Sequence, residues 1–387
     1  MTKEKTRKKP VRGLKFKIRM CALALACLAL VSFVLCTMFA GDKGIISYLE
    51  NYVYSDPVPI NPDLSFKLSD EKDCYEIYNS GDSMKILQLT DVHLGCGFMT
   101  TDVDRFVVDE VFKCVKAVKP DFIVLSGDIL SPIYVRSGTK NSYLQLEATL
   151  LMMKKIGLPW AYVFGNHDSE GMASKEYISE TLENTENCYF LSGEKELFGS
   201  GNYLIKEYNA DGSTLISSLF FMDSGGGSVL GYDGPHDDQI EWYKKKVLSL
   251  NEENPDAKSL LFLHIPLPEY ETAWNEYENG SENVEYFYGV KDEGVSCGQQ
   301  RGLYEKIKTL GNTRWIFCGH DHKNNFSILV KSDNVRLTFG MSMDYSAYVL
   351  TRFYTKYRGG TVITVKHDYS ADVTYAPQEK GYVPQTI

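Results

Sequence analysis

The chain has 387 residues, of which 43% are hydrophobic and 13% aromatic, so it can build a sizeable core and shows no sign of global disorder. Residues 1–19 contain nine Lys or Arg and one acidic residue, a net charge of +8 against −10 for the whole chain, which leaves −18 on the remaining 368 residues. This acidic balance argues against nucleic acid as a partner, because non-specific binding to nucleic acid needs basic surface that displaces counterions from the phosphates.

An uncharged apolar run follows the basic segment 1–19 and covers residues 20–40. As a helix it would be about 31 Å long, close to the hydrocarbon thickness of a bilayer. A signal-peptide core usually has about 7–15 apolar residues, so this run favours an uncleaved signal anchor, while cleavage after Ala40 to give a secreted product stays open. In both cases residues 1–19 are predicted to stay in the cytoplasm, as a basic cytoplasmic segment, and the body of the chain to lie outside it.

Repeated strand and helix patterns begin at Met84, after a predicted linker over 41–83 that shows no strong period. Five short apolar runs each end in a turn with polar residues: 84–90, 122–126, 160–164, 259–263 and 314–318. Helical patterns occur at 102–119, 141–156, 174–185, 236–250 and 300–310. Strands that alternate with helices predict an α/β fold with a largely parallel sheet.

The later part of the chain adds strand-like runs with few helices between them, which suggests a second sheet packed on the first. These runs are 202–208, 214–222, 335–341, 348–354 and 360–366. Residues 269–300 are acidic and rich in tyrosine, and we expect a long loop there, either a solvated insertion or a rim that controls access to a site. The predicted domain covers 84–370, followed by a tail over 371–387. The nine cysteines show no paired spacing, so no disulfide is predicted.

Polar side chains that can bind metal follow all five of the first apolar runs. Because ligands lie beyond the carboxyl ends of the strands in open α/β sheets, we expect these side chains to converge. Two pairs of them are two residues apart, so on an extended chain both members of a pair would point to the same side. The set, which uses five of the seven histidines, is Asp91, His93, Asp128, Asn166, His167, Asp168, His264, His320 and His322.

This set mixes carboxylate oxygen with imidazole nitrogen and needs no thiolate, which suits Mn, Fe or Zn better than calcium or magnesium. Seven or eight ligands are too many for one ion, but two ions about 3.5–4 Å apart and bridged by a carboxylate would use them all. Each motif alone has a simpler interpretation. His264 could be a core histidine, Asp128 part of a Gly-Asp turn, and residues 165–168 a helix cap. Their coincidence at five strand ends favours a metal site.

The ordered motifs DVH (91–93), GD (127–128), GNHD (165–168), His264 and GHDH (319–322) resemble the calcineurin-like metallophosphoesterase superfamily. The resemblance runs from about residue 84 to about residue 354. Further stretches, such as SGNYLI and MDSGG, resemble a narrower group of plant small purple-acid-phosphatase-like proteins and a fungal cell-cycle phosphatase. The resemblance implies a four-layer αββα sandwich of two mixed sheets. The apolar run 20–40 places an N-terminal transmembrane or signal helix before it.

The resemblance also implies roles for the polar residues. It places a first metal ion on Asp91, His93 and His322. It places a second ion on Asn166, His264 and His320. Asp128 would bridge the two ions, and a hydroxide held between them would attack the phosphate ester. His167 would be the general acid, oriented by Asp168. Ser131 stands where true purple acid phosphatases carry a tyrosine ligand, so their iron–tyrosinate chromophore is not expected.

The predicted function is therefore that of a dinuclear-metal phosphoesterase acting on a small-molecule or phosphoprotein phosphate ester. Its catalytic domain is expected to be extracytoplasmic, held at the membrane through residues 20–40 or secreted. Two alternatives stay open. One is a non-catalytic, membrane-anchored metal-binding domain with a sensor or adhesion role. The other, within the enzyme class, is phosphodiester rather than phosphomonoester hydrolysis.

Overall fold

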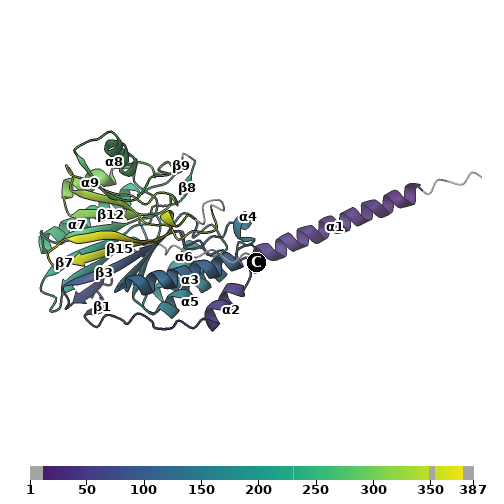
Figure 1. Cartoon of the computed structure of the whole chain (residues 1–387), viewed down its shortest axis with the longest axis horizontal. Coiled ribbons are helices and arrows are strands. Elements are labelled where there is room, and N and C mark those ends of the chain that lie inside the picture. The colour runs from purple at the N-terminus through teal and green to yellow at the C-terminus, as the bar shows by residue number, and fades with distance from the viewer. Residues whose placement is uncertain (1–11, 230, 348–353, 378–387) are drawn as a thin grey trace, which may run out of the picture.

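The computed structural model describes residues 12–229, 231–347 and 354–377. A body of two sheets with covering helices carries one long helix, α1 (Arg12–Ala40), which leaves the body as a single rod (Figure 1). α1 is long and apolar enough to cross a membrane, a property that a signal sequence near the N-terminus shares. The apolar helix predicted over 20–40 is therefore present, and it begins earlier, at Arg12.

The smaller sheet has five strands in the order β16-β15-β3-β4-β5. β3, β4 and β5 are parallel, whereas β15 pairs antiparallel with both β3 and β16. Its strands are β3 (Ser83–Leu89), β4 (Phe122–Ser126), β5 (Trp160–Val163), β15 (Gly359–Lys366) and β16 (Ala371–Pro377). The helices that follow β3, β4 and β5 are α3 (Thr101–Val118), α4 (Tyr134–Ser137), α5 (Ser142–Ile156) and α6 (Lys175–Glu183).

The larger sheet has nine strands in the order β1-β2-β6-β7-β10-β12-β14-β13-β11, with both parallel and antiparallel pairs. Its strands are β1 (Leu64–Leu68), β2 (Tyr75–Asn79), β6 (Tyr203–Asn209), β7 (Leu215–Phe221), β10 (Lys258–Phe262), β11 (Val284–Tyr288), β12 (Thr313–Cys318), β13 (Ser327–Val330) and β14 (Val335–Phe339). The remaining elements are α2 (Gly44–Asn51), α7 (Asp237–Glu253), α8 (Glu269–Glu278), α9 (Leu303–Leu310), the short hairpin β8 (Gly227–Ser228) and β9 (Gly231–Tyr232), and the 3₁₀ turn Thr355–Tyr357.

The two sheets pack face to face. Alternate side chains of the larger sheet belong to two different cores, one of them shared with the smaller sheet. Phe221, Phe262 and Phe317 stack in a row and join the core shared with the smaller sheet. Their neighbours Phe220 and Leu261 point to the opposite face and join a second core with α7, α8 and α9. This alternation is the period of two expected of a strand. The predicted four-layer αββα sandwich of two mixed sheets is confirmed.

Three predicted segments differ from the structure. The expected linker 41–83 contains α2 and the strands β1 and β2, which extend the larger sheet. These elements are eight, five and five residues long, too short for a periodic pattern to stand out. The expected loop 269–300 begins with α8 and contributes the edge strand β11, and β16 lies in the expected tail. Residues 348–353 of the predicted strand 348–354 lie outside the described residues.

Candidate metal centre

The polar residues that follow five strands meet at one place, where the carboxyl ends of β3, β4 and β5 face those of β10 and β12. They form two groups, and within each group the potential ligand atoms lie within 4.8 Å of one another. Group one is Asp91, His93 and His322. Group two is Asp128, His264 and His320. Each group therefore draws on both sheets, as a site between two packed sheets requires.

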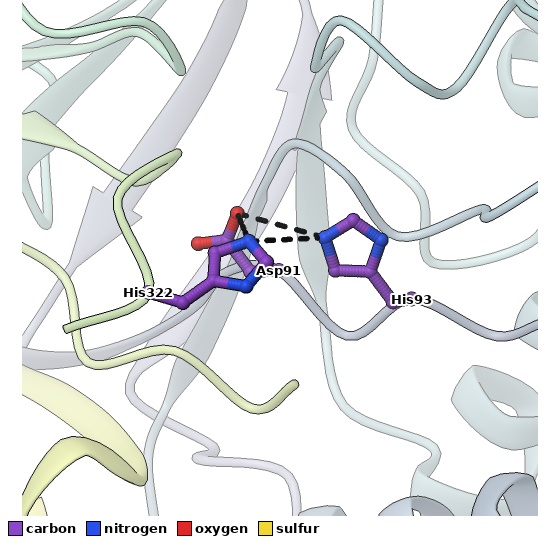
Figure 2. A group of neighbouring side chains, drawn as sticks. All are labelled: Asp91, His93 and His322. Carbon is purple, nitrogen blue, oxygen red and sulfur yellow. Dashed lines mark hydrogen bonds and ion pairs between the residues drawn. The ribbon is translucent and has the colours of Figure 1, made fainter. Parts of the chain in front are cut away.

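In group one, the three side chains face one another (Figure 2). The Nε2 atoms of His93 and His322 lie 3.2 Å apart, and Asp91 Oδ1 lies 3.3 Å from His322 Nε2 and 4.0 Å from His93 Nε2. All three side chains are buried. Two imidazole nitrogens and a carboxylate oxygen thus point to a common centre, which is the donor arrangement that a cation of the transition-metal type prefers.

In group two, Asp128 Oδ2 lies 3.2 Å from His264 Nε2. The two groups are adjacent, because Asp128 Oδ2 also lies 3.8 Å from His93 Nε2, and Asp91 Oδ1 lies 3.9 Å from His264 Nε2. Asn166 is 7% exposed, and its Oδ1 accepts no hydrogen bond within the described part of the chain. A buried amide oxygen without a donor is costly, so this atom is free to act as a ligand.

The backbone brings the ligands together by left-handed turns rather than by an extended chain. Asp91, His93, Asp128 and His320 have φ angles of 54°, 52°, 51° and 79°. The expectation that residues two apart on an extended strand share a face was therefore the wrong reason for their convergence. The ligands converge because these residues adopt strained left-handed turns, which cost about 1–3 kcal/mol each and cluster at functional sites. Gly127 (φ 96°) permits the turn at Asp128, since a side chain there would collide with the ring of His264.

Two of the imidazoles are held through the nitrogen that faces away from the site. His264 Nδ1 lies 3.0 Å from the carbonyl oxygen of Ser126, and His322 Nδ1 lies 3.0 Å from Asp344 Oδ2. Such partners fix the ring orientation and leave Nε2 for a metal. Asp344 was missed in the sequence analysis, although it follows β14, which runs parallel to β12 and therefore ends at the same edge.

The charges of the carboxylates divide the histidines into two kinds. Burial alone would lower the pKa of His322, but Asp91 and Asp344 raise it to about 10. Asp128 similarly outweighs burial and raises the pKa of His264 to about 9. Burial prevails at the other two rings and lowers the pKa of His93 to about 4 and that of His320 to about 3. In the absence of metal, each group thus contains one charged and one neutral imidazole at neutral pH.

His167 lies beside group two and is more accessible than the ligands of group one. Its backbone N–H donates to Asp128 Oδ1 at 2.8 Å, and its Nδ1 lies 2.7 Å from Glu170 Oε2. Burial lowers the pKa of His167, but the hydrogen bond to Glu170 and the charge of Asp128 raise it above the usual value, against a smaller opposing effect of Arg136. The ring is therefore positioned by Glu170, a residue that the sequence analysis did not select.

Asp168 has a different place from the predicted one. Its carboxylate is fully buried and accepts the backbone N–H groups of Gly165, Asp128, Ile129 and Leu130. Within the described part of the chain, the hydrogen bonds of the Asp168 carboxylate go to these backbone groups and none goes to His167, so these contacts do not support the expectation that Asp168 orients His167. Asp168 instead ties the turn after β5 to the turn after β4, and so holds Asn166 and Asp128 next to each other.

The donor set fits a pair of cations. Two buried carboxylates, four imidazoles and one amide oxygen surround the centre, and the Nε2 atom of His264 makes no hydrogen bond among the described residues. Oxygen and imidazole nitrogen without thiolate suit Mn, Fe or Zn. The two groups share close carboxylate contacts, the arrangement that a two-metal site uses.

The chain belongs to the calcineurin-like phosphoesterase family, whose model matches residues 84–324. It is 30% identical over 312 residues to "Probable inactive purple acid phosphatase 28" of Arabidopsis thaliana, which covers 69% of this chain and 72% of that protein. It is also 30% identical over 266 residues to the phosphatase DCR2 of Saccharomyces cerevisiae, 63% of this chain and 45% of that protein.

The fold is shared with a dimetal phosphatase from Danio rerio, at a TM-score of 0.50 and 9% sequence identity, over 77% of this chain and 98% of the other. The family depends on two metal ions, and this chain carries two candidate groups to hold them. The plant relative is named as inactive and the yeast relative as a phosphatase. Membership therefore establishes the class, and turnover by this chain is a separate question.

Proposed function

We propose that this protein hydrolyses phosphate esters with two bound cations. In group one, Asp91, His93 and His322 would hold one ion. In group two, His264 and His320 would hold the other together with Asn166. Asp128 would contact both, because its Oδ2 lies 3.2 Å from an imidazole of group two and 3.8 Å from one of group one. The convergence of these donors from both sheets is the observation that carries the proposal.

The chain's own residues supply the remaining chemistry. Bound cations would lower the pKa of a coordinated water and neutralise charge on the phosphate. His167 is placed to donate a proton to the departing alkoxide, because Glu170 holds its Nδ1 and leaves Nε2 toward the centre, 3.9 Å from Asp128 Oδ2. Its raised pKa favours the protonated ring, which is the form that a general acid requires. Asp168 acts indirectly, by fixing the two turns that carry Asn166 and Asp128.

A membrane location completes the proposal. α1 serves as an uncleaved anchor, and the basic residues before its apolar run keep that end in the cytoplasm, which places the catalytic domain outside. The substrate is a phosphate ester, and the acidic body disfavours nucleic acid.

Turnover by the full chain tests the proposal. The protein, purified in detergent and loaded with Mn²⁺, is given p-nitrophenyl phosphate and bis-p-nitrophenyl phosphate, with and without chelator. We expect chelator-sensitive release of p-nitrophenol, and the ratio of the two rates separates phosphomonoester from phosphodiester hydrolysis. Asp128→Asn, purified in parallel, should lose at least about 10²-fold in rate and so excludes a contaminating phosphatase.

The second candidate function is metal binding without turnover, and the names of the plant relatives favour it. It predicts that two equivalents of metal bind while neither substrate is hydrolysed. That result would overturn the enzymatic proposal and leave the sensor or adhesion role in its place.

A further inference from the structure

The last turns of α1 are bonded to the body of the protein instead of passing into a free linker. The carbonyl oxygen of Met38 accepts the backbone N–H of Lys140 at 2.8 Å and the hydroxyl of Thr139 at 3.0 Å. Asn141 Nδ2 donates to the carbonyl oxygen of Phe39 at 3.0 Å. The carbonyl groups at a helix C-terminus have no partner within the helix, and here the body supplies partners for three of them, those of Met38, Phe39 and Ala40.

The loops that receive α1 are the loops that carry the metal centre. Asp42, just after α1, donates its backbone N–H at 2.8 Å to Cys96, which lies three residues beyond His93. Lys140 donates from its side chain to the carbonyl oxygen of Glu170 at 3.2 Å, and Glu170 holds His167. α4, which follows Asp128 by six residues, lies next to the root of α1 (Figure 1). The accessible edge of the centre, with His167, is therefore the edge beside α1.

Three large apolar side chains are exposed around this root. Phe98, Met99 and Val135 are 51%, 52% and 78% exposed, and we call them the apolar rim. They are neighbours, because the Phe98 ring and Met99 both approach Gly138, at the end of α4. Scattered exposed apolar residues need no explanation. An adjacent set that surrounds the root of a helix long enough to cross a bilayer fits a contact with lipid.

The depth of the rim can be placed along α1. The ring of Phe98 packs against Phe33 of α1, with centroids 5.8 Å apart. Phe33 lies seven residues before the end of the uncharged run at Ala40, which is about 10 Å along a helix. If that run spans the hydrocarbon, Phe98 enters it, and the loops bonded to Met38 and Asp42 lie at the level of the lipid headgroups.

We propose that the apolar rim inserts into the bilayer around α1, so that the metal centre opens at the headgroup layer and acts on phosphate esters of lipid headgroups. This substrate class rests on the proposed phosphoesterase function. Arg136, next to Val135, makes no side-chain hydrogen bond or ion pair among the described residues, and it lies close enough to His167 to act on its charge. A free cation beside the lipid-facing rim suits an anionic headgroup.

The test uses the full chain in phosphatidylcholine vesicles. A tryptophan at position 135 (Val135→Trp) should be quenched by brominated phosphatidylcholine above the background of the native tryptophans. Leu248→Trp is the matched control, because Leu248 is 45% exposed on α7, at the end of the body away from α1 (Figure 1). Equal quenching of the two variants, or none, overturns the insertion of the rim.

Hydrolysis is measured in the same vesicles on phosphatidic acid and on soluble p-nitrophenyl phosphate. Phe98→Ser combined with Val135→Ser should lower phosphate release from phosphatidic acid about tenfold and leave p-nitrophenyl phosphate hydrolysis unchanged, because only access to lipid is weakened. Leu248→Ser should change neither rate. Wild-type protein that hydrolyses the soluble ester but not the lipid overturns the substrate class alone. Wild-type protein that hydrolyses neither of these monoesters, nor the diester bis-p-nitrophenyl phosphate, overturns the phosphoesterase function, and the quenching result then still decides the insertion.

Discussion

Group one and group two each combine one carboxylate with two imidazoles, yet their surroundings differ. In group one, the carboxylate of Asp344 holds His322 at 3.0 Å, and the backbone N–H groups of Ser346 and Ala347 in turn hold Asp344. Arg358 also donates to the carbonyl oxygen of His322, at 3.0 Å. In group two, the corresponding partner of His264 is a backbone carbonyl, which carries no charge.

The accessible titratable side chain, His167, lies next to group two. His167 donates its backbone N–H to Asp128 of group two, and its side chain is 22% exposed, whereas the ligands of group one are at most 7% exposed. A charged outer partner makes an imidazole a better metal ligand, and an accessible acid is needed where the leaving group departs. Under the proposed function, group one would thus retain its ion more firmly, and group two would lie next to the proposed proton donor, His167.

Replacing the proton donor should give the largest effect. His167→Ala removes the general acid without touching a ligand of either group, so we expect a loss of about 10²–10⁴-fold in turnover of alkyl phosphates, which have poor leaving groups. p-Nitrophenyl phosphate, whose leaving group needs no proton, should lose much less. The measurement is the rate on both esters, with metal content determined in the same preparation.

Metal content decides what this variant means. Two ions in His167→Ala confirm that the histidine is separate from both groups. Loss of the ion from group two would show that His167 is a ligand, and equal losses on both esters would remove it as an acid.

The difference in outer partners can be tested at Asp344. Asp344→Asn keeps the size of the side chain but removes the charge that supports His322, so the affinity of group one for its ion should fall about 10–100-fold. Group two should keep its affinity. Stepwise binding of Mn²⁺ by calorimetry resolves the two groups, and a uniform loss at both would contradict the division.

Asp321→Asn is the matched control for this experiment. Asp321 lies between His320 and His322 in the sequence and is equally buried, but its carboxylate accepts hydrogen bonds from Ser296 and Asn324 and touches no imidazole. It should leave both affinities within a few-fold of the wild type.

The two groups should nevertheless respond alike to pH. An imidazole must lose its extra proton before it can bind a metal, and each group holds one imidazole with a raised pKa, about 10 at His322 and about 9 at His264, beside one that is already neutral. Each ion therefore displaces one proton, and each affinity should rise about tenfold per pH unit up to about pH 9. Calorimetry in buffers of different ionisation enthalpy counts the protons. Release from one group only would mean that the groups are charged differently.

Much of the site could be predicted because strand ends are local features. The Gly-Asp, GNHD and GHDH turns follow apolar runs whose positions a single sequence reveals, and parallel strands bring such turns to one edge. Asp344 follows the same rule but lies in a stretch, MSMDYS, without a glycine turn or a histidine to draw attention to it.

The partners of the catalytic residues could not be predicted in the same way. Sequence proximity favoured Asp168 as the partner of His167, yet the carboxylate of Asp168 accepts hydrogen bonds from the backbone N–H groups at 128–130. Those donors come from another strand end, 38–40 residues away in sequence. The strands β1 and β2 were missed for a related reason, since β1 pairs with β2, and β2 joins the sheet by pairing with β6, far along the chain.

A substitution at Glu170 should give the smallest effect, and it tests the environment of His167 specifically. Its side chain is 44% exposed, so its ion pair with His167 is worth about 0.5–1 kcal/mol, or about twofold to fivefold in rate. The pair raises the pKa of His167, and a general acid works only while protonated, so activity falls as pH rises through that pKa. Glu170→Gln lowers the pKa and should move this falling limb of the pH–rate profile to lower pH. Glu180→Gln, on the exposed face of α6, should leave the profile in place. A shift of the rising limb at low pH instead would mean that Glu170 acts on the metal groups. That result would contradict the division of roles between group one and the side that carries His167.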